Sequence, residues 1–280
     1  MKVETMLTTN DGSNPLADEL ELALAATREA GRVAMSFFRT AHETWEKGPG
    51  QIVTEADIAI DRLLKERLLG ARPGYGWLSE ESEDDPVRLQ RRMVWVVDPI
   101  DGTRSFAEGT PEFTISVALV EDGVAVVGIV LNPATDELFL AARGRGATLN
   151  GVPVAATAQG SLEGARVVAS RFESRRRRFG ELLPSVELMG IGSLAYKLAL
   201  VAAGRYDGYL SWRRTHDWDI AGAAALLAEA GARFTDADGS PIVLNREHPV
   251  HEGLLAGGTA VHASLLNATR AGRAAYLERR

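Results

Sequence analysis

Four runs rich in β-branched residues follow one another closely in the first half of the chain, and they limit its possible folds more than any other feature. The runs lie at residues 93–97, 113–120, 124–131 and 138–141. Residues 121–123 read EDG, which is typical of a hairpin turn between two of the runs. The sequence therefore predicts a largely antiparallel sheet in this part of the chain.

Two amphipathic helices are expected before this sheet. Asn14 and Pro15 form a helix-start signal, and apolar residues then recur at helical spacing as far as Phe38. Residues 54–57 read TEAD, which resembles a capping box and predicts a second helix through Leu69. We expect these two helices to pack together.

Strands and helices alternate beyond residue 160. The expected strands lie at 166–169, 187–189 and 206–210, and the expected helices lie at 173–183, 192–203 and 219–230. This alternation is typical of an α/β layer. We therefore predict an α/β (α+β) fold with an N-terminal α+β subdomain at 1–160 and a C-terminal α/β subdomain at 161–280.

Composition narrows the classes of partner and metal. The 280 residues are 45% hydrophobic, enough for a sizeable core, and include no cysteine, so any metal must be held by oxygen or imidazole ligands. A net charge of -7 argues against a nucleic-acid polymer as partner, and we interpret the basic run at 175–178 as a solvated helix face. Without a run of about 18 apolar residues or a secretion signal, we expect no membrane span and a cytoplasmic location.

The strongest chemical signal is the segment WVVDPIDGT, in which a hydrophobic strand runs into two aspartates three positions apart. Pro99 fixes its own φ and lacks an N–H donor, which predicts a turn there. Gly102 lets a ligand approach the backbone closely. Asp98, Asp101 and the Ile100 carbonyl would then face one point.

Asp often forms turns through local side-chain bonds, so this segment alone leaves a purely structural role open. Two further acidic sites favour a metal. Glu80 and Glu81 follow a strand candidate at 75–78, and Asp219 stands in the first turn of an alanine-rich helix. A solvated acidic loop and a plain helix cap are the alternative interpretations. Carboxylates packed together repel one another, and a divalent cation resolves that repulsion.

Three motifs in this order and spacing resemble the inositol monophosphatase family of metal-dependent phosphatases: EES at 80–82, DPIDGT at 98–103 and WDIAG at 218–222. Further similar segments extend the resemblance over nearly the whole chain, at 53–57, 132–133, 146–151 and 192–195. The resemblance implies a layered α-β-α-β-α sandwich of the inositol monophosphatase and fructose-1,6-bisphosphatase type, with the active site between the two halves.

The resemblance also implies a site for two or three Mg²⁺ ions in the N-terminal subdomain. Its ligands would be Glu80, Asp98, the Ile100 carbonyl, Asp101 and Asp219, with Asp98 bridging two ions. Asp57 and Thr103 would orient and activate the attacking water, Glu80 could contact it, and Thr54 would support them. The expected substrate contacts are Gly102, Thr103, Ser193, Arg213 and Asp219.

The backbone that follows the strand end at Asp101 is also suited to binding a phosphate. The amides of Gly102, Thr103 and Arg104 follow a strand end and could form a helix N-terminus aimed at an anion. Lys47 lies close to the position of a loop lysine of the family, and an ordinary surface lysine is the alternative interpretation.

One segment departs from the family pattern. In inositol monophosphatases a glutamate several residues before the Trp-Asp pair contacts the inositol hydroxyls, whereas residues 211–217 read SWRRTHD here. Arg213, Arg214 and His216 could instead pair with a second phosphate, which suits a 3'(2'),5'-bisphosphate nucleotidase acting on 3'-phosphoadenosine 5'-phosphate. A solvated loop is the alternative interpretation.

We therefore expect a Mg²⁺-dependent phosphomonoesterase that hydrolyses a small phosphate ester, with inositol phosphate as the first substrate. The alternatives are the bisphosphate nucleotidase, a histidinol-phosphatase, and a non-catalytic binding protein on the same fold. A homodimer is possible by analogy with the family. His248 and His251 have zinc-like spacing but no third ligand, and Trp212 and Trp218 are expected to pack in the core.

Overall fold

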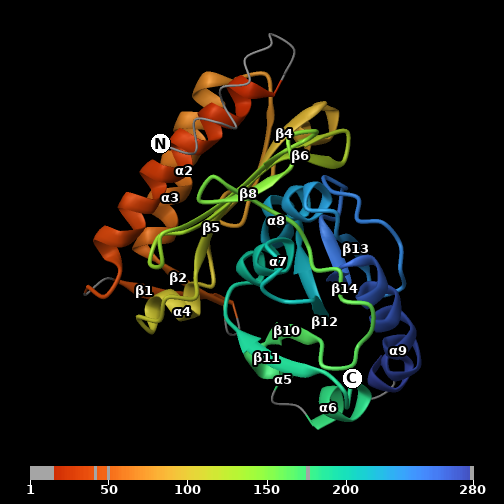
Figure 1. The fold of residues 1–280 in the computed structure, drawn as a ribbon. Coiled ribbons are helices and arrows are strands. Elements are labelled where there is room, and N and C mark those ends of the chain that lie inside the picture. The colour runs from red at the N-terminus through yellow and green to blue at the C-terminus, as the bar shows by residue number, and fades with distance from the viewer. Residues whose placement is uncertain (1–15, 41–42, 49–50, 175–176, 278–280) are drawn as a thin grey trace.

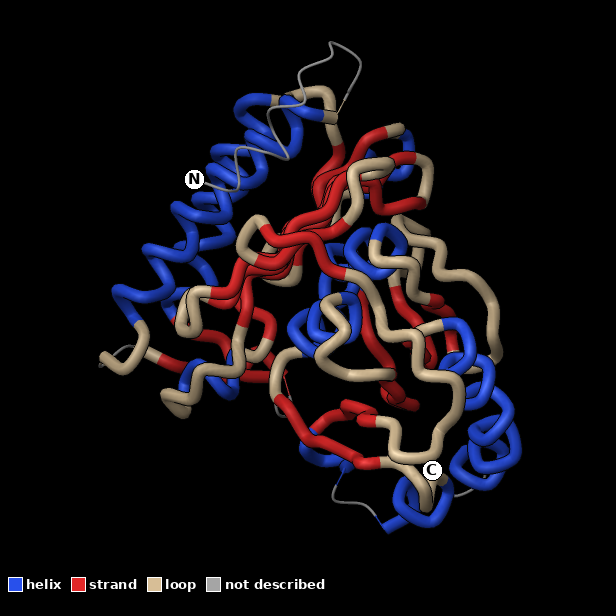
Figure 2. Tube along the Cα trace, viewed as in Figure 1, coloured by secondary structure: helices blue, strands red, loops and turns tan. Residues whose placement is uncertain are grey.

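Two sheets and three groups of helices alternate in five layers (Figures 1 and 2). The computed structural model describes residues 16–40, 43–48, 51–174 and 177–277, and within these the side chains of 47, 51, 177–179 and 271–277 are not described. The order of the layers confirms the predicted α-β-α-β-α sandwich. The expected helix start at Asn14 and Pro15 lies outside the described residues.

Helices α2 (Ala17–Phe37) and α3 (Glu55–Ala71) pack side by side and form the first layer, as the sequence predicts (Figure 1). Between them, β1 (Thr44–Gly48) and β2 (Gln51–Thr54) form a short antiparallel hairpin. These two strands were not predicted from the sequence.

The second layer is a seven-stranded sheet in the order β3-β4-β5-β6-β7-β8-β9. Its strands are β3 (Gly76–Ser79), β4 (Met93–Asp101), β5 (Thr114–Glu121), β6 (Val124–Asn132), β7 (Glu137–Ala142), β8 (Ala147–Leu149) and β9 (Val152–Val154). Strands β3 and β4 are parallel and the other neighbours are antiparallel. The predicted hairpin turn is present, with positive φ at Asp122 and Gly123.

The central strands of this sheet are buried on both faces, so they read as continuous apolar runs rather than as alternating ones. On one face, Ile60 and Leu64 of α3 pack with Trp95 and Val97 in one core. The other face packs against the helices of the third layer, in a second core. Full burial of each large apolar side chain contributes about 1.5–3 kcal/mol to folding.

Helices α7 (Leu194–Ala202) and α8 (Asp217–Glu229) form the third layer and pack against both sheets. The sheets are built from residues on either side of 155–165. Because α7 and α8 join them into one packed body, the division into subdomains near residue 160 stays a prediction.

The fourth layer is a five-stranded sheet in the order β11-β10-β12-β14-β13. Its strands are β10 (Arg166–Ser170), β11 (Glu187–Ile191), β12 (Gly208–His216), β13 (Arg233–Asp236) and β14 (Val250–Gly257). The outer helices are α5 (Arg171–Ser174), α6 (Arg177–Leu182) and α9 (Thr259–Leu277). Helices α5 and α6 lie in the region of the single helix expected at 173–183, and residues 175–176 between them lie outside the described residues. Strands β13 and β14 and helix α9 were not predicted.

No helix in the described part of the chain is long and apolar enough to cross a membrane.

Candidate active site

Asp98 and Asp101 lie at the end of β4, where the pairing with β5 contains an irregularity. Asp98 pairs with Ser116 and Asp101 with Thr114, so three steps along β4 oppose two along β5. The strand therefore continues through Pro99 in a bulge rather than ending in the predicted turn. A bulge is one of the few places where a sheet accepts proline. It also corrects the alternation that would otherwise send residues three apart to opposite faces.

The short helix α4 (Thr103–Ala107) begins directly after Gly102, as predicted. Gly102 has φ 96, and a Cβ there would lie 2.8 Å from the carbonyl oxygen of Glu112 and 3.2 Å from Ser193. Glycine is thus required at this position by its positive φ and by the close approach of Glu112 and Ser193. This is a different reason from the ligand approach expected from the sequence.

Glu80 follows β3 in a turn that Asp61 of α3 holds. The Asp61 carboxylate accepts hydrogen bonds from Ser79 Oγ at 2.5 Å and from Ser82 Oγ at 2.6 Å. Trp77 Nε1 also donates to Ser82 Oγ at 3.2 Å. Sequence reasoning missed Asp61. The available signal was its place one helical turn after Asp57, on the same face of α3.

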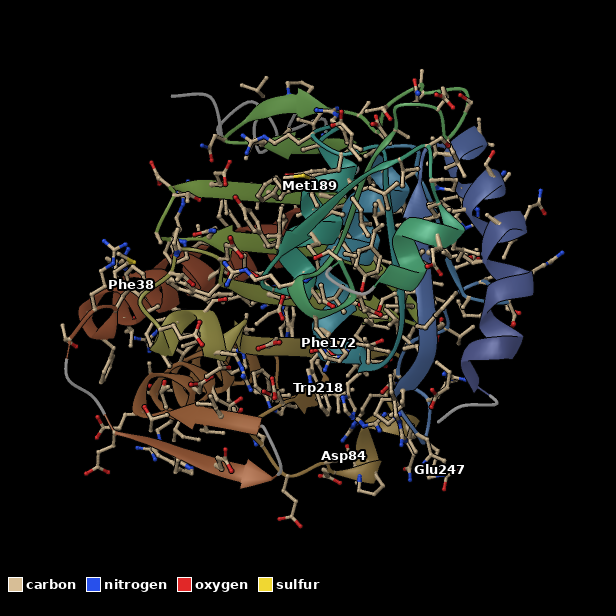
Figure 3. All side chains as sticks on the ribbon, turned by 90° about the horizontal axis from the view of Figure 1, so that it is seen from below. Phe38, Asp84, Phe172, Met189, Trp218 and Glu247 are labelled. Atoms are coloured by element: carbon tan, nitrogen blue, oxygen red, sulfur yellow. The ribbon has the colours of Figure 1, made fainter. Side chains whose placement is uncertain are left out.

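Asp219 occupies the first turn of α8, as predicted. Its Oδ2 accepts a hydrogen bond from the backbone N–H of His216 at 2.7 Å. The His216 ring stacks on Trp218, labelled in Figure 3, with ring centroids 4.4 Å apart and an interplanar angle of 7°. Trp218 is half-buried and packs against the second core, and Trp212 is buried in the core as expected.

Tertiary packing brings Glu80, Asp98 and Asp219 together. One oxygen from each lies within 4.8 Å of the others. Asp98 is 1% exposed, and neither of its carboxylate oxygens has a hydrogen-bond partner among the described residues. A buried carboxylate without a partner is costly unless a cation binds it. Three converging hard oxygen donors therefore fit a hard divalent cation such as Mg²⁺.

The electrostatics of the cluster favour the same conclusion. Burial raises the pKa of Asp98 well above its usual range, and the charges of Glu80, Asp101 and Asp219 raise it further. Burial and nearby carboxylates likewise raise the pKa of Asp219, although the His216 hydrogen bond opposes them. Binding of a cation would oppose these shifts and favour the charged forms of both carboxylates.

Asp101 lies at the same strand end as Asp98, but its oxygen Oδ2 already accepts two hydrogen bonds. Ser193 Oγ and the Ala195 N–H each donate to that oxygen at 2.5 Å. Burial raises the pKa of Asp101, while the Ser193 hydrogen bond and the Lys197 charge oppose that rise. The predicted ligand Ile100 offers its carbonyl oxygen nearby, and this oxygen accepts from Thr103 Oγ1 at 3.0 Å.

Asp57 and Thr103 are brought into contact, at 3.3 Å between Asp57 Oδ1 and Thr103 Oγ1. The other oxygen of Asp57 accepts from the Thr54 N–H at 2.8 Å and from the Thr54 hydroxyl at 2.6 Å, which completes the capping arrangement of α3. Burial raises the pKa of Asp57 to about 7, despite the opposing Thr54 hydrogen bonds. A carboxylate of this kind can exchange a proton near neutral pH.

The two arginines lie in strand β12, not in the solvated loop that the sequence also allowed. Both are exposed. Arg213 lies within a register shift between Ser211 and Arg214, and Arg214 resumes the pairing with β14. Arg214 Nε lies 3.7 Å from Glu252, whereas Arg213 has no ion pair among the described residues. The positive charge of Arg213 contributes to lowering the pKa of the buried Lys197 in α7.

The two histidines of the zinc-like motif differ in burial. His251 lies in β14 and is buried, and its Nε2 lies 2.7 Å from Asp217 Oδ1. His248 is exposed in the preceding segment. The side chain of Lys47 and most of the basic run at 175–178 lie outside the described residues, so their expected roles stay predictions.

Comparison with known proteins agrees with this site. The inositol monophosphatase family matches residues 16–273. An inositol-1-monophosphatase of Rhizobium meliloti (strain 1021) is 40% identical over 218 residues, which cover 72% of this chain and 81% of that protein. An inositol-1-monophosphatase of Bacillus subtilis (strain 168) is 32% identical, over 88% of this chain and 94% of that protein.

Solved structures share the whole architecture. The extragenic suppressor protein suhB from Bartonella henselae aligns with a TM-score of 0.82 and 29% identity, over 91% of this chain and 99% of that one. The Thermotoga maritima IMPase aligns with a TM-score of 0.82 and 27% identity, over 92% and 99% of the two chains. The chain therefore belongs to the inositol monophosphatase family, a family of metal-dependent phosphoric monoester hydrolases.

Proposed function

We propose that this protein is a Mg²⁺-dependent phosphomonoesterase that hydrolyses a small phosphorylated metabolite, with inositol phosphates as the first substrate class. The single observation that carries the proposal is Asp98, a buried carboxylate whose oxygens have no partner among the described residues and which faces Glu80 and Asp219. The names of the relatives support inositol phosphate as the substrate.

The residues that would hold two or three Mg²⁺ ions are Glu80, Asp98, Asp101, Asp219 and the Ile100 carbonyl. Bound Mg²⁺ supplies Lewis-acid chemistry, which polarises the phosphate ester and lowers the pKa of water. The packed carboxylates contribute the negative charge that attracts the ions into a buried site.

Asp57 and Thr103 would handle the proton of the attacking water. The Thr103 hydroxyl has one hydrogen, and its oxygen lies 3.3 Å from Asp57 Oδ1 and 3.0 Å from the Ile100 carbonyl oxygen. When it donates that hydrogen to Asp57, it can accept a hydrogen bond from water. Asp57 takes up the Thr103 hydroxyl proton as Thr103 receives one from the water, and the water oxygen forms a bond to phosphorus. The ester oxygen leaves with the electron pair of the broken P–O bond and takes a proton from solvent water. No covalent phosphoenzyme is needed. The amides of Gly102, Thr103 and Arg104 would bind the phosphate oxygens.

A bisphosphate nucleotidase is the second candidate, favoured by Arg213. This cation stands on β12, whose end leads into the helix that carries Asp219. It has no ion pair among the described residues, and it would meet the second phosphate of a substrate such as 3'-phosphoadenosine 5'-phosphate. Ser193 would contribute a further substrate contact. No observation favours the histidinol-phosphatase. The presence of every predicted carboxylate in the sequence argues against the non-catalytic alternative.

The test is phosphate release by the purified protein with Mg²⁺, and with EDTA as control. The substrates are myo-inositol 1-phosphate, 3'-phosphoadenosine 5'-phosphate, fructose 1,6-bisphosphate and histidinol phosphate. Preference for inositol phosphate supports the first candidate, and preference for the bisphosphate nucleotide supports the second. Release that persists in EDTA, or no release from any substrate, would contradict the proposal. The cytoplasmic location, the absence of a nucleic-acid partner and the homodimer stay predictions.

A further inference from the structure

The turn between β11 and α7 carries an unusual backbone conformation. Ser193 has φ 54 and ψ 126, and a positive φ is uncommon for residues other than glycine. Such a conformation costs about 1–3 kcal/mol and persists only where surrounding contacts fix it. The contacts around residues 191–195 therefore show which residues fix the turn and which residue the turn holds.

Lys197 supplies two of these contacts from within α7. Its Nζ donates to the Ser193 carbonyl at 2.7 Å and to the Ile191 carbonyl at 3.1 Å. The residue is 4% exposed, and burial lowers its pKa to about 8, with Asp101 opposing the shift. Burying an ammonium group is costly. The two carbonyl contacts and the charge of Asp101 offset that cost at this position.

The turn holds Asp101 in its own right. Ser193 Oγ and the Ala195 N–H both donate to Asp101 Oδ2, each at 2.5 Å. Thr114, the partner of Asp101 in the sheet register, places its Oγ1 3.1 Å from Ser193 Oγ. The N–H of Gly192 donates to the Glu112 carboxylate, which ties the turn to the chain before β5. The orientation of the Asp101 carboxylate thus depends on the shape of the turn.

We propose that Lys197 is a positioning residue, which holds the 191–195 turn in the shape that fixes the Asp101 carboxylate for divalent-cation binding. The inference rests on the proposed function, because it takes Asp101 as part of the cation site. Lys197 acts through Ser193 and Ala195 and touches no reacting atom.

The sign of the effect on Mg²⁺ affinity separates positioning from plain electrostatics. Lys197 is a cation close to Asp101 and Asp219, and its charge lowers the pKa of both. If charge alone mattered, replacing Lys197 by a neutral residue would remove a repulsion and tighten Mg²⁺ binding. If positioning matters, the same replacement weakens binding, because Asp101 loses its fixed orientation.

The experiment measures Mg²⁺ affinity by isothermal titration calorimetry at pH 7.5 for the wild type, Lys197→Met, Ser193→Ala and the double variant. Methionine keeps the length of the side chain and removes its donors. Lys65→Met is the matched control, since it removes one lysine charge from the exposed face of α3. We expect Lys197→Met and Ser193→Ala each to weaken binding about 10-fold or more, the range for partners that orient metal ligands.

The double variant tests whether the two residues act through the same oxygen. We expect it to bind Mg²⁺ only slightly more weakly than the weaker single variant, whereas independent effects would multiply. Unchanged or tighter binding by Lys197→Met, or multiplicative effects, would overturn the inference alone. Wild-type protein that binds no Mg²⁺ would overturn the proposed function as well. If Lys197→Met does not fold, Ser193→Ala decides: unchanged affinity there removes the link between the turn and Asp101.

Discussion

Thr103 and Asp57 meet across 46 positions of sequence, with 3.3 Å between the hydroxyl oxygen and Oδ1 of the carboxylate. The contact joins the first turn of α4 to the first turn of α3. Its importance for proton transfer can be tested with Thr103→Ala and Thr103→Ser.

We expect Thr103→Ala to lower kcat by about 100-fold or more, the usual size of an acid–base contribution. The free energy of unfolding should fall by only about 1 kcal/mol, the typical net value of a hydrogen bond. Thr103→Ser keeps the hydroxyl and should retain most of the activity. Unchanged kinetics in the alanine variant would remove Thr103 from the mechanism.

A second prediction concerns Asp98. Asp98→Asn removes the negative charge of the carboxylate that would bind the cation together with Glu80 and Asp219. Turnover should therefore be nearly abolished and Mg²⁺ binding strongly weakened. In the wild type, Mg²⁺ at 100 times its Kd should raise the free energy of unfolding by about 2.7 kcal/mol. Thermal unfolding with Mg²⁺ and with EDTA measures the difference. Full activity in the Asp98→Asn variant would contradict the metal-site proposal.

A third prediction is the pH dependence of stability in EDTA. The pKa of Asp57 is raised from 3.8 to about 7, so the folded protein binds this proton more tightly than the unfolded chain does. The folded state is therefore favoured at low pH, and this contribution is lost as pH rises from about 4 to about 7. Urea unfolding at several pH values should show the slope.

Asp57→Asn should flatten that slope, because asparagine does not titrate. Asp136→Asn is the control, since Asp136 lies on an exposed turn away from the cluster. An unchanged slope in the Asp57 variant would show that other buried carboxylates account for it. A stability that rises with pH over this range would contradict the argument from burial.

A fourth prediction concerns Asp61, which holds the turn around Glu80. Asp61→Ala leaves Ser79 and Ser82 without their shared acceptor. We expect Mg²⁺ affinity to fall about 10-fold and stability to fall by about 1–3 kcal/mol. Ser82→Ala, which removes one of the two contacts, should give a smaller effect on both. Equal Mg²⁺ affinity in wild type and Asp61→Ala would contradict a positioning role.

A fifth prediction separates the two substrate candidates. Arg213→Ala should raise KM for 3'-phosphoadenosine 5'-phosphate if Arg213 binds its second phosphate, and should leave KM for a monophosphate little changed. Arg214→Ala is the matched control, because Arg214 pairs with the exposed Glu252. Equal KM values for the bisphosphate in both variants would leave inositol phosphate as the better-supported substrate.

The elements with a strong local pattern were predictable from sequence. The apolar runs of β4, β5 and β6 and the periodic faces of α2 and α3 were found where they were expected. Short or polar elements such as β13 and the β1–β2 hairpin were not. Their pairing partners are set by the rest of the fold rather than by their own residues.

Burial pattern and motif spacing are local properties, so the sequence identified the central strands, the first two helices and the acidic candidates for the site. How those acids converge depends on the tertiary structure. The bulge at Asp98 turns two aspartates toward one region, and Asp61 and Lys197 hold parts of the cluster through side-chain contacts. Such contacts depend on strand register and on the packing of separate layers, so spacing along the chain can place a residue on a helix face but does not show which partners it reaches.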